Sequence, residues 1–219
     1  MTETRRGRPR TPLLSRETIV EATLKVIDAE GIAAVGMRSV ARALGVDAKS
    51  LYNHVDGKDG LLDAVTEHLL GGLVLPERTG NPRTDLRAIA GSFRDQALKH
   101  PQAAPLVLTR QLASARALAP VNAVLTVLRD AGAGIEEAVH MLRMLLATLI
   151  GTLLREVSAA PAFGNNDRED TLTTSGLPAL AEAAPHLARF DRQAEYEYTV
   201  DLAVTAVLQR IDLRGRLAP

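Results

Sequence analysis

Hydrophobic residues recur every three to four positions along most of the chain, which is the spacing of one face of an α-helix. No stretch alternates hydrophobic and polar residues for long enough to predict a strand. We therefore expect an all-α fold of about ten helices. The predicted helices cover residues 16–30, 37–44, 48–55, 58–72, 82–99, 102–110, 116–131, 135–157, 177–189 and 192–211.

Two segments interrupt the helical pattern. Residues 76–82 have no hydrophobic period and contain Pro76, Gly80 and Pro82, so we place a domain boundary there. The predicted division is a basic arm at 1–14, a first domain at 15–72 and a second domain at 76–219. Residues 158–175 turn polar and predict a long loop.

A helix-turn-helix pattern occupies residues 37–56. Two crossing helices need a small residue where they touch, a turn residue that tolerates positive φ, and a core residue, and Ala41, Gly45 and Leu51 stand at those places. The second helix then presents a short, hydrogen-bonding surface that suits the major groove of DNA. The outward residues are Lys49, Ser50, Tyr52, Asn53 and His54. The pattern also arises by chance in helical hairpins, so alone it leaves a purely structural role open.

Charge supports the DNA-binding interpretation. The 26 basic and 26 acidic residues cancel, yet the N-terminal arm carries Arg5, Arg6, Arg8 and Arg10 with Glu3 as its one acidic residue. Such an arm suits the narrow minor groove of DNA, and its alternative role is a solvated tail. Lys58 is predicted at a helix start, where the free backbone N–H groups and the ammonium together favour a phosphate.

Other chemistry is not expected. The chain has no Cys, no Gly-rich phosphate loop and no Gly-x-Ser-x-Gly, so we expect neither an enzyme nor a cofactor. His100, His140 and His186 are not spaced as metal ligands, and we expect no metal. Residues 144–154 are too short an apolar run to cross a bilayer, and the N-terminus lacks an apolar signal segment. We expect no membrane partner and a cytoplasmic location.

Residues 31–62 resemble the DNA-binding region of the TetR family of one-component bacterial transcriptional regulators. The resemblance rests on the series Leu51-Tyr52-x-His54-Val55-x-x-Lys58-x-x-Leu61-Leu62. The second domain is similar, more weakly, to the effector domain of the tetracycline-repressor subgroup. That similarity rests on Asp85-Leu86-Arg87, His100-Pro101 and Leu128-x-x-Ala131-Gly132.

The resemblance implies roles for individual residues. Arg38, Lys49 and Ser50 occupy the places that reach base edges, and Tyr52, His54 and Lys58 occupy those that hold phosphates. Gly36 replaces the Thr that usually caps the second helix and touches phosphate, so we expect that contact to be missing. Lys49 replaces a Pro or small residue, which predicts an added phosphate or guanine contact.

The resemblance also places an effector site among the fifth to eighth helices. Plain core is the alternative role for each candidate, and the scarcity of aromatic residues favours a small apolar effector held by its shape. The candidates are Phe93, Leu112, Val124, Leu128, His140, Met144 and Thr148, with Arg110 or Arg143 as a charged anchor.

Two long apolar helices predict a homodimer, because one domain core can hardly cover both. The predicted interface residues are Leu145, Leu149, Leu153, Tyr196, Val200, Ala203, Val207 and Ile211. The sequence thus predicts a homodimeric repressor that leaves palindromic operator DNA when a small apolar molecule binds. The alternatives are a constitutive helical DNA-binding or scaffold protein without an effector and, third, an all-α enzyme.

Overall fold

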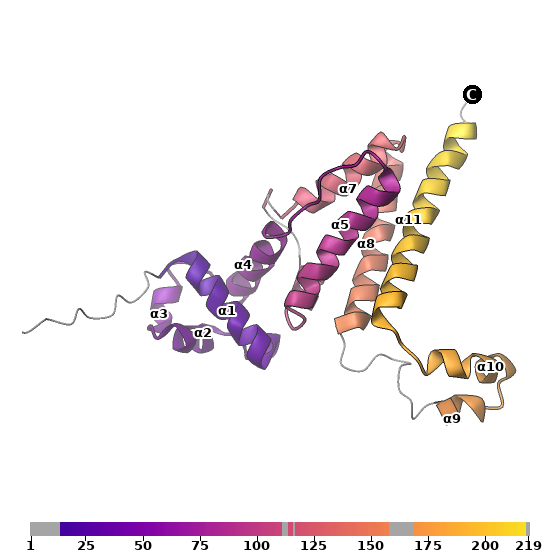
Figure 1. Ribbon diagram of the computed structural model, residues 1–219. Coiled ribbons are helices and arrows are strands. Elements are labelled where there is room, and N and C mark those ends of the chain that lie inside the picture. Colours follow the sequence, from indigo (N-terminus) through magenta and orange to yellow (C-terminus); the bar gives the residue numbers. More distant parts are fainter. Residues whose placement is uncertain (1–13, 111–113, 116, 158–168, 218–219) are drawn as a thin grey trace, which may run out of the picture. The chain divides into compact units, whose positions relative to one another are not determined.

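The computed structural model describes residues 14–110, 114–115, 117–157 and 169–217, and in these ranges it contains helices and no strand (Figure 1). The predicted all-α fold is confirmed. Contacts divide the chain into two compact units, residues 1–65 and 66–219, with the division inside helix α4. The predicted boundary at 76–82 lies between α4 and α5.

The first unit contains α1 (Arg16–Glu30), a 3-10 turn (Ile32–Ala34), α2 (Met37–Leu44), α3 (Ala48–Leu51) and the start of α4 (Gly57–Gly71). The side chain of Ser15 accepts the N–H of Thr18 and caps α1, while Thr18 caps it in return. Helix α1 packs on α2, and α2 packs on α3 around a fully buried core. That core includes Ile19, Ile27, Val40, Leu51 and Leu61.

The turn between α2 and α3 has the geometry that the sequence predicts. Gly45 ends α2 in the left-handed conformation with φ of 68°, where a side chain is disfavoured. The N-terminus of α2 is capped from within, because the Ser39 hydroxyl accepts the Gly36 N–H at 3.0 Å and donates to the Ala34 carbonyl at 2.8 Å. Ser39 therefore stabilises the start of α2, because Gly36 at the N-cap position has no side chain to cap the helix.

The second unit is a bundle formed mainly by α5 (Pro82–Lys99), α7 (Ala119–Asp130), α8 (Ile135–Val157) and α11 (Arg192–Leu217). Its other helices are α6 (Ala104–Thr109), α9 (Glu169–Thr173) and α10 (Pro178–Leu187), and α9 packs on α10. Helix α11 packs along α8 and α5, and α7 packs on both α5 and α8. The most buried core residues are Val127, Leu128, Ala138 and Leu153.

Helix α8 is long and apolar enough to span a membrane by length and composition, with a mean hydropathy of 1.4 over its most apolar 18 residues. It nevertheless packs against α5, α6, α7 and α11. It also carries the exposed charges Glu136, Arg143 and Arg155. We interpret α8 as a helix of the bundle.

The structure differs from the predicted elements at several ends. Eleven α-helices occur in the described ranges, because α9 lies inside the predicted loop 158–175. Helix α9 has no buried residue and therefore no hydrophobic period to reveal it. Helix α3 is shorter than predicted because residues 52–54 form turns. Helix α7 starts later than predicted, at Ala119, and α11 runs on to Leu217.

Candidate nucleic-acid interface and ligand cavity

Nearly all the described residues predicted to contact DNA lie on the surface of the first unit. The side chain of Leu51 is fully buried, whereas that of the next residue, Tyr52, is 60% exposed. Neighbouring residues of α3 and of the turn after it therefore face opposite sides, one the core and the other the solvent. Ser50 is half-buried. The exposed members are Arg38, Lys49, Tyr52, Asn53, His54 and Lys58. Arg5, Arg6, Arg8 and Arg10 lie outside the described residues.

Three of these residues line one open concavity. Arg38 comes from α2, Tyr52 from the turn after α3, and Lys58 from the first turn of α4. Arg42 joins them, and none of the residues that line the concavity is acidic. Arg38 and Lys58 stand in the first turns of α2 and α4, and with Arg42 from the last turn of α2 they favour a bound phosphate. The sequence predictions missed Arg42, although it stands one helical turn after Arg38 and so shares its face.

Helix α3 holds Lys49 at the surface. The Asp47 carboxylate caps the helix by accepting the Lys49 N–H at 2.7 Å. Leu51, two positions later, is fully buried and fastens the other side of the helix to the core. The Lys49 side chain therefore lies on the exposed side of a helix whose opposite side packs in the core. Lys58 is exposed as well, and its ammonium donates to the Ala33 carbonyl at 3.4 Å.

The second unit contains an apolar cavity of about 60 Å³ between α5, α7, α8 and α11. Its lining is apolar except for the hydroxyl of Thr148. A water needs roughly 10–15 Å³ by this kind of measure, so the cavity has room for only a few water-sized groups. The lining residues are Leu86, Ile89, Ala90, Phe93, Pro120, Val121, Val124, Leu142, Leu145, Leu146, Thr148, Leu149, Val200, Ala203 and Val204.

Only three of the predicted effector residues that the structure describes line this cavity. Phe93, Val124 and Thr148 line the cavity, whereas Leu128 is fully buried in the core. His140, Arg143 and Met144 are exposed, because α8 turns residues 142, 145, 146 and 149 toward the cavity and these three away from it. Arg110, at the end of α6, is half-buried and does not line the cavity, and Leu112 lies outside the described residues.

The residues predicted for the dimer interface face inward in a single chain. Leu145, Leu149, Val200 and Ala203 line the cavity. The others are buried in the core: Leu153, Tyr196, Val207 and Ile211. The predicted spacing is thus also the spacing of the side of α8 and α11 that packs within the bundle, where Leu145 and Leu149 remain half-buried.

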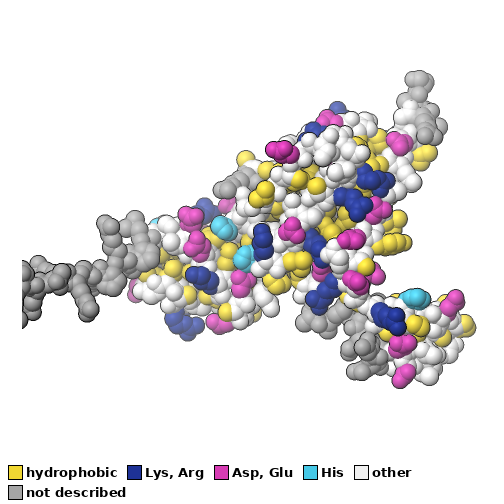
Figure 2. All heavy atoms as spheres, viewed as in Figure 1, with side chains coloured by type: hydrophobic (Ala, Val, Ile, Leu, Met, Phe, Trp, Pro, Cys, Tyr) yellow, Lys and Arg dark blue, Asp and Glu magenta, His cyan; other side chains and the backbone are white. Residues whose placement is uncertain are grey.

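Different apolar residues of α8 and α11 are exposed. Tyr198, Leu202 and Leu213 are 70%, 58% and 58% exposed, and Ala206 continues their line at helical spacing. On α8 the exposed residues include Met144, Ala147 and Gly151. We call these seven residues the outer stripe. Figure 2 shows hydrophobic side chains along the edge of the unit where α11 runs.

A buried polar cluster joins α5, α8 and α11. The Arg94 Nε donates to both carboxylate oxygens of Glu156 at 2.9 Å, and the guanidinium lies 4.6 Å from the centre of the Tyr196 ring. The hydrogen bonds with Glu156 raise the pKa of Arg94, and burial raises the pKa of Tyr196 to about 12. Arg94 thus stays charged and Tyr196 neutral at ordinary pH. The ion pair with Glu156 connects α5 to α8, and the contact with the Tyr196 ring connects α5 to α11.

Among the described residues, no three His, Asp or Glu side chains come close enough together to hold a metal ion. His100, His140 and His186 lie on three different segments of the second unit. The absence of a metal from the site therefore stays a prediction.

The family model described as bacterial regulatory proteins of the tetR family matches residues 19–65, and the tetracyclin repressor-like C-terminal domain matches residues 75–204. The chain belongs to the TetR family. It is a TetR-family transcriptional regulator, and the known members of this family that resemble it are regulators and not enzymes.

Similar proteins cover most of this TetR-family chain. An HTH-type transcriptional regulator of Saccharopolyspora erythraea is 33% identical over 90% of this chain and 88% of its own. The tetracycline repressor protein class C of Escherichia coli is 31% identical over 78% of this chain and 80% of its own. The structure of ActR from Streptomyces coelicolor in complex with actinorhodin has a TM-score of 0.80 and 25% identity, and it covers 90% of this chain and 96% of ActR.

Proposed function

We propose that this TetR-family regulator is a homodimeric repressor that binds palindromic operator DNA and is released when a small, mostly apolar molecule enters the second unit. The observation that carries the proposal is the cavity between α5, α7, α8 and α11, because fifteen side chains from four helices enclose a space with a single hydroxyl. The protein acts in the cytoplasm, where the operator DNA is, and uses no cofactor other than the effector.

The DNA-binding part of the proposal rests on the first unit. Arg38, Arg42 and Lys58 surround an open concavity without an acidic side chain in its lining, which is the charge arrangement that a phosphate group needs. Lys49 and Asn53 are exposed on α3 and in the turn after it, where the second helix of the motif meets base edges. We propose that the first group positions the protein on the backbone and the second group reads sequence.

The effector is proposed to be larger than the empty cavity. A volume of about 60 Å³ holds few atoms, so binding has to move α5, α7, α8 and α11 apart, and the side chains that line the cavity are almost all aliphatic. ActR, a protein of the same fold, is known in complex with actinorhodin. We propose that Thr148 provides the one hydrogen-bonding side chain within the lining, and that shape accounts for most of the remaining affinity.

The dimer is proposed to form through the outer stripe. Solvent exposure of Tyr198, Leu202 and Leu213 is costly for a single chain, and a two-fold interface would bury them against the same stripe of the second chain. Helix α8 adds Ala147 and Gly151, whose small size permits close helix contact. A dimer also matches palindromic operator DNA, in which each half-site receives one copy of the first unit.

The small cavity favours one competing function, a constitutive DNA-binding protein without an effector. The two functions are distinguished by selecting bound duplexes from random DNA, footprinting the selected operator, and repeating the footprint with a panel of apolar compounds. We expect a palindromic footprint that at least one compound abolishes. A footprint that no compound weakens supports the constitutive protein, and the absence of any preferred sequence contradicts both.

A further inference from the structure

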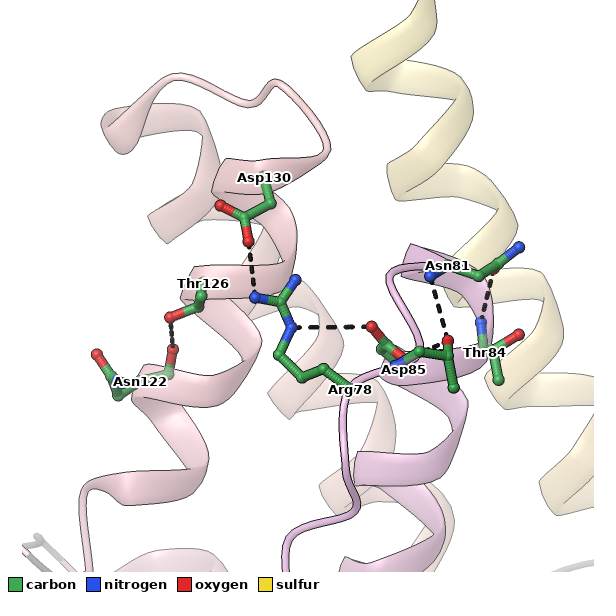
Figure 3. A network of polar contacts seen from close by, with 8 residues as sticks. Arg78, Asn81, Thr84, Asp85, Asn122, Thr126 and Asp130 are labelled. Carbon is green, nitrogen blue, oxygen red and sulfur yellow. Dashed lines mark hydrogen bonds and ion pairs between the residues drawn. The ribbon is translucent and has the colours of Figure 1, made fainter.

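The chain between α4 and α5, residues 72–81, is fastened to the second unit by polar contacts that we call the connector clamp. It consists of Arg78 and Thr79 from the connector, Asp85 from α5 and Asp130 from α7 (Figure 3). The Asp85 side chain is 3% exposed. Its Oδ1 accepts hydrogen bonds from the backbone N–H and the hydroxyl of Thr79, at 2.8 and 2.7 Å.

Arg78 lies between the two carboxylates of the clamp (Figure 3). Its Nη1 is 2.7 Å from Asp130 Oδ2, and its Nε is 3.8 Å from Asp85 Oδ2. The hydrogen bonds from Thr79, with a smaller contribution from the Arg78 charge, hold the pKa of Asp85 below its usual value. A buried, ionised carboxylate is stable only with hydrogen-bond donors or cations beside it. Thr79 and Arg78 provide these to Asp85, so the contact holds the connector against α5.

The clamp borders a second, smaller cavity of about 30 Å³, which lies behind the connector. Its lining includes Leu75, Arg78, Asp85 and Ile89. Ile89 also lines the effector cavity, so one side chain forms a wall of both. Helix α7 likewise contributes residues 123 and 127 to the small cavity and residues 121 and 124 to the large one. The connector and the effector cavity therefore lie against the same two helices.

We propose that the connector clamp transmits the occupancy of the effector cavity to α4. Widening of the cavity moves α5 relative to α7, and the two carboxylates that hold Arg78 stand one on each of these helices. A change in their separation displaces Arg78 and, with it, the connector that follows α4. Arg78 is thus a positioning residue that touches neither DNA nor effector. This inference rests on the proposed function, because it requires a DNA-binding protein that responds to its cavity.

The test uses the absence of cysteine from the chain, which allows one cysteine to be introduced and modified selectively. In Ala90→Cys, benzyl methanethiosulfonate attaches a benzyl group inside the effector cavity and imitates an occupied site, with complete labelling verified by mass spectrometry. Operator affinity is measured before and after labelling. Hydrogen exchange of the peptide that covers residues 72–81 reports on the connector itself.

The same measurements are made with the clamp broken by Arg78→Met. The matched control is Asp201→Asn, which removes two similarly exposed ion pairs between Asp201 of α11 and Arg83 and Arg87 of α5, neither of which involves the connector. We expect labelling to lower operator affinity at least tenfold and to speed connector exchange in Ala90→Cys alone and with Asp201→Asn. With Arg78→Met we expect a loss below threefold.

An equal loss of affinity with and without Arg78→Met overturns the inference. If labelling leaves operator affinity unchanged in every variant, the proposed release by an effector fails. The hydrogen-exchange rate of residues 72–81 then tests whether the clamp responds to the cavity. Exchange that responds to the label only with Arg78 present supports transmission as far as the connector. Exchange that ignores the label, or responds equally without Arg78, contradicts it. The second variant Asp130→Asn breaks the same bridge from α7 and has to give the same result.

Discussion

The two units of this protein distribute their charges in opposite ways. In the first unit, Arg38, Arg42 and Lys58 line one concavity together with no acidic residue. In the second unit, arginines of α5 and α11 meet carboxylates of neighbouring helices, as Arg94 meets Glu156 and Arg210 meets Glu137. Cations gathered without carboxylates attract an external polyanion, whereas paired charges connect helices of the fold.

The contrast teaches that the same residue type serves binding in one unit and architecture in the other. Substitutions of basic residues in the first unit should therefore change DNA affinity with little effect on stability. Substitutions of buried basic residues in the second unit should do the reverse.

The largest effect is expected from Leu202→Glu in the outer stripe. Leu202 is 58% exposed in one chain, so the variant should fold, but a two-fold interface would place two carboxylates in an apolar contact. We expect monomers by sedimentation and operator affinity reduced to that for random DNA, a loss of about 10³-fold or more. The control is Leu177→Glu, because Leu177 is equally exposed but lies outside the stripe. A Leu202→Glu protein that remains dimeric excludes this face as the interface.

The next effect concerns stability alone. Arg94→Met leaves the carboxylate of Glu156 buried without its cation, which costs about 3–5 kcal/mol in the free energy of unfolding. Arg210→Met removes an exposed arginine from Glu137, which keeps its ion pair with Arg214, and should cost roughly 0–1 kcal/mol. Urea denaturation measures both. If Arg94→Met loses less than about 1 kcal/mol, the cluster with Tyr196 is not a stabilising contact.

Local patterns in the sequence predicted the first unit well. Ala41, Gly45 and Leu51 lie within a dozen positions of one another, and Gly45 adopts the positive φ that the turn requires. The helix ends are also local features, as the capping of α1 by Ser15 shows. Such features depend on neighbours in the chain, so a sequence can reveal them without knowledge of tertiary packing.

The second unit depends on contacts between distant segments, and there the sequence was less informative. A helical period shows that Val207 and Leu202 lie on different faces of α11, but both faces are apolar, and only packing against α5 and α8 decides which is buried. The family resemblance placed His140 and Met144 in the effector site, and both side chains are exposed on α8. Asp85 was part of the family resemblance, but its burial beside Thr79 could not be inferred from its position in the series.

A smaller effect distinguishes the two kinds of DNA contact. Lys58→Ala should weaken binding equally on operator and random DNA, and two lost contacts per dimer should make the slope of log affinity against log salt shallower by about 1.8. Lys49→Ala should cost about 1–3 kcal/mol per half-site on the operator and much less on random DNA. Titrations at several salt concentrations measure both. Equal specificity ratios for the two variants identify Lys49 as a phosphate contact.

The smallest expected effect is a dependence of stability on acid, and it concerns Asp85. Because the folded pKa of Asp85 lies below the ordinary 3.8, the carboxyl is charged in both states above about pH 4 and contributes its full stabilisation there. As the pH falls, the unfolded chain takes up the proton first, and the contribution disappears as the pH passes the folded pKa. Asp85→Asn has no such proton to take up.

The stability difference between the protein and Asp85→Asn should therefore be constant from pH 6 to pH 5 and shrink below about pH 4. Urea midpoints at pH 6, 5, 4 and 3 measure this difference directly, and titrations shared by both proteins cancel. A difference that keeps its size down to pH 3 contradicts a lowered pKa. It would also mean that the hydrogen bonds from Thr79 do not favour the charged form, so that the connector would be held by Arg78 and Asp130 alone.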